Sequence, residues 1–338
     1  MQHDNTGHEI AAQVDAWKDA HNVTVAAGAS IKVLWERQTY DQIVVTGCGS
    51  THYLAKTAAS LLQAHTGVLS QAAPASELLL HPQTIYGHGK PLLIAISRSG
   101  ATSETIQAVE QFKDRYQSEV IIISCYDDKP LNAPATLNLT ARAGQELSVA
   151  QTRSFSAMLV MAEGLARALG DASPGVGQFA GTMQGWVTEA RELAAQYADP
   201  QRFQRVFYLG SGALYGLACE AMLKMKEMSL TNAEAFHTLE FRHGPKSMVD
   251  GETLVVGLLD GRNATELAVI EEMRALGATT VTLSQAEGAG ITIPLKHYAD
   301  RPSLVHYMPF VQWLAYLRAI KKGLNPDTPR NLDQVVIL

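Results

Sequence analysis

Two kinds of hydrophobic pattern alternate along most of this chain. Short runs of consecutive apolar, often β-branched residues predict buried strands, which we place at 43–46, 91–96, 120–124, 136–140, 206–209, 253–259 and 279–283. Longer stretches with apolar residues every three or four positions predict helices, at 52–65, 102–116, 149–169, 179–197, 214–229 and 265–276. Strands that alternate with helices favour parallel sheets covered on both faces, so we expect an α/β fold.

The first forty residues show only the helical pattern. Ile10, Val14, Trp17 and His21 fall at helical spacing, and a second helical segment is expected at 23–37. We therefore expect an N-terminal helical segment, 1–40, before the first sheet.

A unit made of a strand, a glycine turn and a helix occurs twice in the sequence. Gly47-Cys48-Gly49 follows the strand at 43–46, and Gly210-Ser211-Gly212 follows the strand at 206–209. This repetition predicts two related domains, each a doubly wound parallel sheet. We place them at 41–170 and 201–324, joined by a linker helix at 171–200 and followed by a C-terminal tail, 325–338.

The loop after the second long strand has the composition of a phosphate site. Ser97, Ser99 and Thr102 place three hydroxyls within six residues, and Gly100 permits close approach of the backbone. A helix is expected to begin near Thr102 and to add the positive end of its dipole. The loop thus predicts a bound phosphate. The alternative is that Ser97 and Thr102 only cap the helix.

A second hydroxyl pair supports the phosphate prediction. Ser50 and Thr51 follow the strand at 43–46, and parallel strands place such ends at one edge of a sheet. The dinucleotide pattern GxGxxG is not met, because Gly47 and Gly49 are followed by His52 where the third glycine would stand, and no GxxxxGK[ST] occurs. In the second half, Asp260 occupies the place of the Ser97 loop, so we expect phosphate binding in the first half only.

Composition limits the partners. The 338 residues are 46% hydrophobic and 18% charged, with a net charge of -6, which is typical of a globular protein. An acidic chain has no general attraction for nucleic acid or for an anionic membrane, and no long apolar run predicts a membrane span. The three cysteines form no CxxC pair and no HExxH occurs, so we expect a cytoplasmic protein with no metal and no cofactor.

Several motifs together resemble the two-domain sugar isomerase (SIS) family. In the first half they are Gly47-Cys48-Gly49-Ser50-Thr51, Ser97-Arg98-Ser99-Gly100-Ala101-Thr102 and Glu146-Leu147-Ser148-Val149-Ala150. In the second half they are Leu223-Lys224-Met225-Lys226-Glu227, Phe241-Arg242-His243-Gly244-Pro245 and Pro329-Arg330-Asn331-Leu332. The resemblance implies two tandem flavodoxin-like SIS domains.

The resemblance also implies roles for single residues. It implies that the phosphate contacts Ser50, Thr51, Ser97, Arg98, Ser99 and Thr102, and that Val149, Ala150 and Gln334 contact the sugar. It makes Glu227 the proton-transfer residue and His243 the ring-opening residue. In similar proteins this His comes from the partner subunit, which implies a homodimer with a shared active site, possibly a tetramer, with the tail over that site.

Interconversion of an aldose and a ketose needs a base that reaches C1 and C2 and a second group that opens the ring. Glu227 and His243 supply these groups without a metal. From the residues alone, Glu227 beside Lys224 and Lys226 would be a solvated charge on a helix surface, and His243 an ordinary loop residue.

Two departures from the synthase branch of the family shape the functional hypothesis. Residue 2 is Gln2 and not the cysteine of a glutaminase domain, and Gln334 stands where the synthase has a lysine that engages the open sugar. We therefore expect an enzyme that isomerises a 2-amino-2-deoxyhexose 6-phosphate, either glucosamine or galactosamine 6-phosphate, and releases ammonia. The alternatives are a fructosamine-6-phosphate deglycase, a plain aldose–ketose phosphate isomerase and a non-enzymatic sugar-phosphate sensor.

Overall fold

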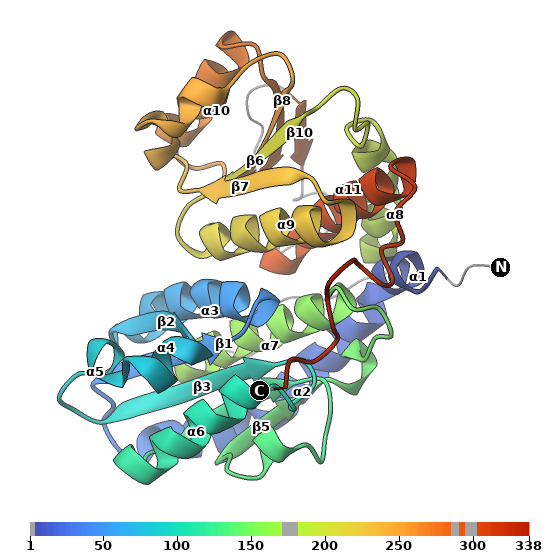
Figure 1. Cartoon of the computed structure of the whole chain (residues 1–338). Helices are drawn as coiled ribbons and strands as arrows, with labels where there is room; N and C mark the ends of the chain where they lie inside the picture. The colour runs from blue at the N-terminus through green and yellow to red at the C-terminus, as the bar shows by residue number, and fades with distance from the viewer. Residues whose placement is uncertain (1–3, 171–181, 285–290, 295–302, 338) are drawn as a thin grey trace. The chain divides into compact units, whose positions relative to one another are not determined.

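The chain folds into two compact units, each built on a five-stranded parallel sheet (Figure 1). The computed structural model describes residues 4–170, 182–284, 291–294 and 303–337. We call the unit with the earlier sheet the first unit; it comprises Ala12–Glu146, Gln151–Val176 and Asp333–Leu338. The second unit comprises Met1–Ala11, Leu147–Ala150 and Gly177–Leu332.

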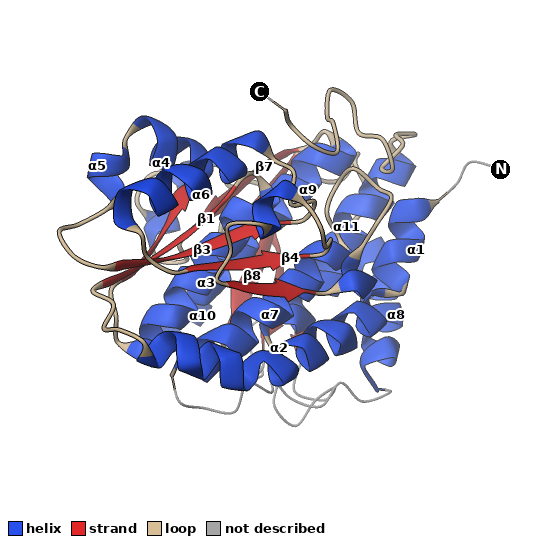
Figure 2. Cartoon of the chain, turned by 90° about the horizontal axis from the view of Figure 1, so that it is seen from below, coloured by secondary structure: helices blue, strands red, loops and turns tan. Residues whose placement is uncertain are grey.

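The first unit has the strand order β2-β1-β3-β4-β5. Its strands are β1 (Gln42–Gly47), β2 (Ser70–Pro74), β3 (Pro91–Ser97), β4 (Val120–Ser124) and β5 (Leu137–Thr140). Its helices are α2 (Gln13–Glu36), α3 (Ser50–Thr66), α4 (Ala75–Leu80), α5 (Pro82–Ile85), α6 (Ser103–Tyr116) and α7 (Arg153–Leu169). Helices α4 and α6 pack together over one face of the sheet, and α2, α3 and α7 pack over the other (Figure 2).

The second unit has the strand order β10-β9-β8-β6-β7. Its strands are β6 (Arg205–Gly210), β7 (Asn232–Phe236), β8 (Thr253–Leu259), β9 (Thr279–Ser284) and β10 (Ile291–Pro294). Its helices are α1 (Asn5–Ala11), α8 (Thr182–Ala195), α9 (Ala213–Ser229), α10 (Ala264–Ala275) and α11 (Met308–Lys321). Helix α10 contacts β8 and β9, whereas α9 packs on β6 and β7 and also contacts α11.

The two sheets repeat one topology, which confirms the predicted relationship between the halves. Read from β2 and from β7, each sheet runs in the order second, first, third, fourth, fifth strand of its unit. The turn glycines repeat as well: Gly49 has φ 57° and ψ -124°, and Gly212 has φ 56° and ψ -130°. Only glycine adopts such dihedrals without strain, so both turns depend on the absence of a side chain.

The cores follow from the central strands. All seven residues of β3 and all seven of β8 are buried, as expected for strands covered on both faces. On one side of the first sheet, Phe112 of α6 packs with Leu78 of α4 and Val44 of β1. The buried parallel sheets therefore hold the loops that follow their strands in place.

Several predicted elements differ from those observed. Helix α2 is continuous, whereas two segments were predicted with a break near Asn22; within it the Thr24 hydroxyl donates to the Ala20 carbonyl at 2.8 Å. Helix α7 begins at Arg153 and not at Val149, since the backbone before it binds a carboxylate described below. Strands β2, β7 and β10 were not predicted. The predicted linker sequence at 171–175 lies outside the described residues.

The chain crosses between the units several times, and the predicted N-terminal helical segment, 1–40, is divided between them at Ala11 and Ala12. Helix α1 belongs to the second unit, where the Asp327 carboxylate accepts from the backbone N–H groups of Asn5 at 2.9 Å and Thr6 at 2.7 Å. This carboxylate caps the start of α1. The predicted tail is likewise divided, because Leu332 ends the second unit and Asp333 begins the last segment of the first.

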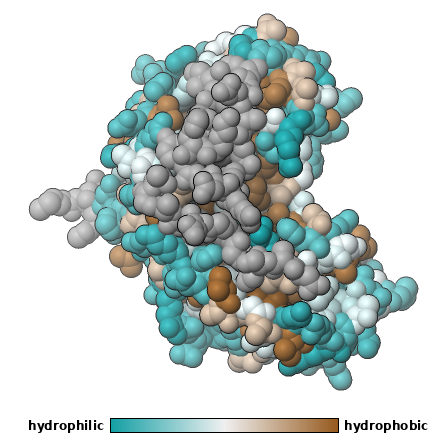
Figure 3. All heavy atoms as spheres, turned by 180° about the vertical axis from the view of Figure 1, so that it is seen from behind, coloured by the Kyte–Doolittle hydropathy of each residue, from teal (hydrophilic) through white to brown (hydrophobic). Residues whose placement is uncertain are grey.

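On the face shown in Figure 3, the hydrophobic residues among those described lie scattered between hydrophilic ones. Isolated exposed apolar residues are normal for folded proteins. Among the described helices, none is long and apolar enough to cross a membrane.

Candidate active site

The predicted phosphate residues of the two loops lie at one edge of the first sheet. Strands β1 and β3 pair in parallel, with Thr46 opposite Ala95, so the segments that follow them emerge side by side. In the sheet, β2 lies on one side of β1 and β3 lies on the other. The strand order therefore reverses between β1 and β3. Ligands of open α/β sheets bind in the crevice at such a point.

The 97–102 loop is closed by its own hydroxyls. Ser97 Oγ accepts from the Gly100 N–H at 3.2 Å, and Ser99 Oγ accepts from the Ala101 N–H at 3.2 Å. Thr102 is the N-cap residue of α6, but its side chain makes no capping hydrogen bond. The capping alternative is therefore not what Thr102 does, and its hydroxyl lies beside a helix N-terminus suited to an anion.

Gly100 fixes the shape of this loop. Its φ is 62°, and a Cβ atom placed there would lie 2.7 Å from the Lys129 Cβ. The Gly100 carbonyl accepts from the Leu131 N–H at 3.1 Å, which holds the loop against the segment that follows β4. Both a left-handed conformation and a close approach thus require glycine at this position.

In the neighbouring loop, Thr51 closes the glycine turn. Its hydroxyl accepts from the Cys48 N–H at 2.9 Å and donates to the Cys48 carbonyl, also at 2.9 Å. A Cβ atom on Gly47 would lie 2.5 Å from this hydroxyl, so the turn is tightly packed. Ser50 is the first residue of α3, and both Ser50 and Thr51 are buried at the end of β1.

Arg98 directs its side chain into the first unit. It is 5% exposed, and its Nη1 lies 3.3 Å from Glu146 Oε1 in a buried ion pair. Its Nη2 donates to the backbone carbonyl of Gln334 at 2.7 Å. The Arg98 guanidinium thus already has a carboxylate and a carbonyl as partners.

Glu146 is the buried partner of Arg98, and the sequence analysis assigned it no role. Its carboxylate accepts from the Thr152 N–H at 3.0 Å, from the Thr152 hydroxyl at 3.0 Å and from the Ser154 N–H at 3.3 Å, and it also bonds the Ser154 hydroxyl. A carboxylate at the N-terminus of α7 is favoured by the helix dipole. The only sequence signal was an acidic residue shortly before a helix start with two hydroxyl residues.

The segment predicted to contact the sugar lies in the second unit. Ser148 donates from its N–H to Glu9 at 3.3 Å and also bonds Glu9 through its hydroxyl, and the Val149 N–H donates to the Asp327 carbonyl at 3.1 Å. Val149 is half-buried and Ala150 is buried. Helix α1 and the 325–328 turn thus fix the backbone of this segment.

Glu227 lies at the end of a chain of charges on α9. Lys224 is fully buried and lies 3.4 Å from the buried carboxylate of Glu220, and its ammonium also bonds Glu227, whose side chain is 18% exposed. From the residues alone Glu227 was expected to be a solvated charge, whereas its side chain is mostly buried and pairs with Lys224. The spacing Glu-x3-Lys-x2-Glu places all three groups on one face of the helix. The apolar residues next to Lys224 in the sequence were the available signal that this face is buried.

The charges of Glu220, Lys224 and Glu227 compensate one another within the second unit. Burial acts to lower the pKa of Lys224, but Glu220 and Glu227 outweigh it, so the pKa of this ammonium lies above its usual value. A charged ammonium therefore stays between the two carboxylates. It orients the Glu227 carboxylate, which is the group open to solvent.

His243 is exposed in a loop held by ion pairs on either side of it. Arg242 Nε lies 2.6 Å from Glu272 Oε2, and Lys246 Nζ lies 2.8 Å from Glu272 Oε1. Hydrogen bonds from Lys246 and from Arg242 hold the pKa of the Glu272 carboxyl below its usual value. Glu272 of α10 thus clamps both flanks of His243, and the charges of Arg242 and Lys246 are balanced locally.

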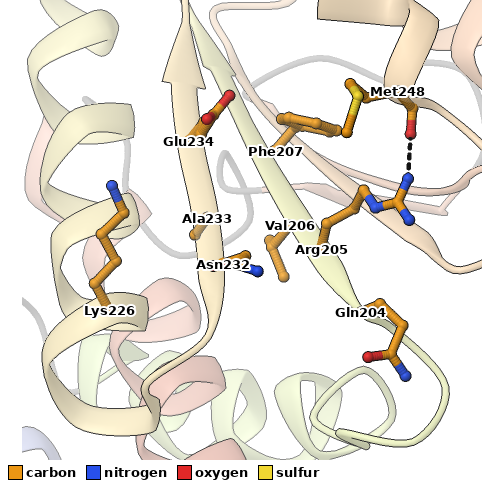
Figure 4. A pocket seen from close by; sticks show the side chains of 9 residues that line it. All are labelled: Gln204, Arg205, Val206, Phe207, Lys226, Asn232, Ala233, Glu234 and Met248. Carbon is orange, nitrogen blue, oxygen red and sulfur yellow. Dashed lines mark hydrogen bonds between the residues drawn. The ribbon is translucent and has the colours of Figure 1, made fainter.

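A hollow of about 570 Å³ in the second unit is lined by none of the predicted site residues (Figure 4). It opens at the amino ends of β6 and β7, where Arg205 donates to the Met248 carbonyl at 2.7 Å, and Lys226 and Glu234 line it. The loops of a parallel sheet that bind ligands follow the carboxyl ends of the strands. This hollow is therefore not the predicted site.

The structure divides the predicted residues between the units. Ser50, Thr51, Ser97, Arg98, Ser99, Thr102 and Gln334 belong to the first unit, and Val149, Ala150, Glu227 and His243 belong to the second. In the described part of the chain, no group of three or more His, Cys, Asp or Glu side chains is placed to hold a metal ion, and Cys48, Cys125 and Cys219 are free thiols.

Comparison with known proteins shows where this arrangement recurs. The sequence matches the SIS domain family over residues 38–168 and 201–291. It is 31% identical to glutamine–fructose-6-phosphate aminotransferase (isomerizing) of Pyrococcus horikoshii over 345 residues, which is 97% of this chain and 56% of that protein. The chain spans about half the length of the curated relatives it matches.

Two solved structures are similar over nearly their whole length. Glucosamine-6-phosphate deaminase of Thermotoga maritima superimposes with a TM-score of 0.75 at 28% identity, covering 96% of this chain and 99% of that one. Tagatose-6-phosphate ketose/aldose isomerase of Escherichia coli superimposes with a TM-score of 0.84 at 26% identity, covering 96% and 94%.

Proposed function

Because the chain belongs to the SIS domain family, we propose that it is a sugar-phosphate isomerase that acts on a 2-amino-2-deoxyhexose 6-phosphate and releases ammonia. The observation that carries the proposal is the buried charge chain of α9, which ends in the solvent-accessible carboxylate of Glu227. A carboxylate fixed by a buried ammonium suits a group that must return a proton to a neighbouring carbon. Similarity to the Thermotoga deaminase supports the loss of ammonia.

The phosphate is assigned to the edge of the first sheet. The Thr102 hydroxyl and the N-terminus of α6 offer donors without a net positive charge, whereas the Gly100 and Ala101 N–H groups already donate to Ser97 Oγ and Ser99 Oγ. Ser50 and Thr51 lie at the adjacent strand end. This arrangement supports a phosphate ligand on an acidic chain that has no general positive field.

In the proposed reaction, Glu227 moves one proton. It removes the proton from C2 of the open-chain amino sugar and delivers it to C1, through an enamine. The resulting C2 imine adds water and expels ammonia, which leaves the ketose 6-phosphate. His243, contributed by the partner subunit of a homodimer, opens the sugar ring before this step.

Gln334 favours ammonia loss from the substrate itself. The resemblance to the synthase places a lysine at this position, and an amide cannot form an imine with a sugar carbonyl. The Gln334 side chain instead donates to the Glu146 carbonyl at 3.4 Å. The substrate's own nitrogen therefore takes part in the chemistry.

A substrate panel tests the proposal. Purified protein is incubated with glucosamine 6-phosphate and with galactosamine 6-phosphate, and ammonia and ketose phosphate are measured separately. Equal amounts of both products from one substrate are expected, and Glu227→Gln should abolish both. Ammonia from neither substrate would rule out the deaminase.

A second candidate is a plain aldose–ketose phosphate isomerase, which the similarity to the tagatose-6-phosphate isomerase favours. It would use Glu227 and His243 in the same way but without a nitrogen at C2. Interconversion of tagatose and galactose 6-phosphates, without ammonia release from either amino sugar, would favour it. Glucose 6-phosphate released from a 6-phosphofructosamine would instead indicate a deglycase.

A further inference from the structure

Two stacked rings join the segments that follow β6 and β7. Tyr215, in the first turn of α9, and His237, the residue after β7, have ring centroids 3.7 Å apart and an interplanar angle of 22°. In the adjacent residues, the Ser211 hydroxyl donates to the Thr238 hydroxyl at 3.1 Å. Both contacts lie at the carboxyl ends of two strands that pair in parallel. The chain that leaves β7 is thus fixed to the start of α9.

The repeat between the units shows what differs at this turn. Gly212 has nearly the same dihedrals as Gly49, so the two glycine turns share one backbone shape. Ala213 and Leu214 follow Gly212, where the first unit has two hydroxyl residues. The second turn therefore lacks the side chains assigned to phosphate in the first unit. At the next position, Tyr215 contacts the neighbouring strand end instead.

His237 begins a short segment that reaches His243. The His237 carbonyl accepts from the Phe241 N–H at 3.1 Å, and the Glu240 carbonyl accepts from the His243 N–H at 2.9 Å. Phe241 is fully buried, and its ring centroid lies 4.9 Å from that of Phe207. These contacts make residues 237–243 one compact turn, so a shift of His237 also displaces His243.

We propose that the stack of Tyr215 on His237 fixes the start of the loop that carries His243, and that His237 is a positioning residue for that group. Glu272 holds the later part of the same loop, so His243 is held from both sides. The stack is made by the faces of the two rings and does not depend on the imidazole nitrogens. The inference rests on the proposed ring-opening role of His243, but the stack can be tested without turnover.

Hydrogen–deuterium exchange of the loop amides provides the first test. The N–H groups of residues 241–243 should exchange at least threefold faster in His237→Ala and in Tyr215→Ala. His237→Phe keeps a flat ring and should bring the exchange back to the wild-type rate. The control is His88→Ala, which changes an exposed histidine of the first unit and should alter no rate in this loop. Wild-type exchange in His237→Ala would overturn the inference.

A double variant tests whether the two rings act together. Once one ring of a contacting pair is removed, loss of the other should have little further effect. Tyr215→Ala combined with His237→Ala should therefore exchange within twofold of the single variants. Rate increases that multiply would show two independent contributions and would contradict the stack.

Ring opening can be followed apart from the proton transfer. In Glu227→Gln, the amino-sugar phosphate identified by the substrate panel should open and close its ring without isomerising, and exchange between its anomers is measured by NMR. Adding His237→Ala should slow this exchange at least threefold, whereas adding His237→Phe should restore most of the rate. If His237→Phe is as slow as His237→Ala, the imidazole itself takes part and the positioning role is wrong.

The two measurements separate this inference from the proposed reaction. If Glu227→Gln does not speed anomer exchange, His243 is not the ring-opening group, and His237 has no such group to position. Amide exchange still decides whether the stack holds the loop, because that measurement involves no substrate. Conversely, deaminase activity together with unchanged amide exchange in His237→Ala would overturn only this inference.

Discussion

The ammonium of Lys224 lies 3.4 Å from the carboxylate of Glu220, and both side chains are completely buried. Removing one member of a buried pair leaves an uncompensated charge, which costs about 3–5 kcal/mol. Lys224→Met is therefore expected to lower the free energy of unfolding by about that amount in urea denaturation. Lys226→Met, which changes the exposed neighbour, should have little effect. Full stability of Lys224→Met would contradict the buried pair.

Glu227→Gln tests the proton transfer with nearly unchanged volume. General base catalysis contributes roughly 10²- to 10⁴-fold, so kcat should fall by about that factor on the substrate identified by the panel. Some stability should be lost as well, because the buried Lys224 ammonium then keeps only Glu220 as a carboxylate partner, so folding of the variant is checked by thermal unfolding. The control is Glu234→Gln, an exposed carboxylate of β7 in the same unit. Turnover by Glu227→Gln at the wild-type rate would exclude its role.

Glu272 is expected to act through His243 and not on the substrate. Glu272→Gln removes the charge that holds Arg242 and Lys246, so the loop should exchange faster and kcat should fall several-fold, with the fold intact. Because the folded-state pKa of Glu272 is lowered, its contribution to stability is present above its usual pKa and is lost as the pH falls through the folded value. Glu271→Gln, one position earlier, provides the control. An unaltered kcat in Glu272→Gln would show that the clamp does not position His243.

His306 predicts how stability depends on pH. It is 1% exposed, and burial lowers its pKa to about 4. Between about pH 6.5 and 4 the unfolded chain takes up a proton that the folded chain does not, so stability falls on acidification by roughly 3 kcal/mol. Urea denaturation at several pH values should show a smaller slope in His306→Leu. The slope should persist in His88→Leu, which changes an exposed histidine.

Gly100→Ala should disturb the phosphate loop. The residue has φ 62°, and its new Cβ would meet the Lys129 Cβ at 2.7 Å. Strain of this kind costs about 1–3 kcal/mol, and inorganic phosphate should stabilise the variant less than the wild type in a thermal shift assay. Gly185→Ala in α8, where a Cβ meets nothing within 4 Å, should instead be neutral or slightly stabilising. Equal phosphate responses in both variants would contradict the assigned loop.

The sequence predicted what local pattern determines. Strand β3 and the hydroxyl loop after it were predictable because seven buried residues and a Ser/Thr-rich turn are adjacent in the chain. Strand β2, Ser-Gln-Ala-Ala-Pro, was not predictable, because an edge strand needs neither β-branched residues nor continuous burial. The loop motif identified the candidate site, but not the direction of the Arg98 side chain.

Long-range partners explain the remaining differences. Arg98 bonds residues 48 and 236 positions away, and no local pattern encodes such pairs. The burial of Lys224 was not predictable, because helical spacing shows which residues share a face but not whether another helix covers that face. Helix α11 packs against α9, and this covering is tertiary information.

The capping of α1 by Asp327 has a consequence for the synthesis of this protein. The N–H group of Asn5 donates to a carboxylate that lies 322 residues later in the chain. At the usual rate of about 5–20 residues per second, a ribosome adds that stretch over tens of seconds. Throughout that time the seven-residue helix has only the local Asp4 carboxylate, which accepts from the Gly7 N–H at 3.0 Å, and it is too short to persist alone in water. Residues 5–11 therefore reach their final structure only after residue 327 has been made.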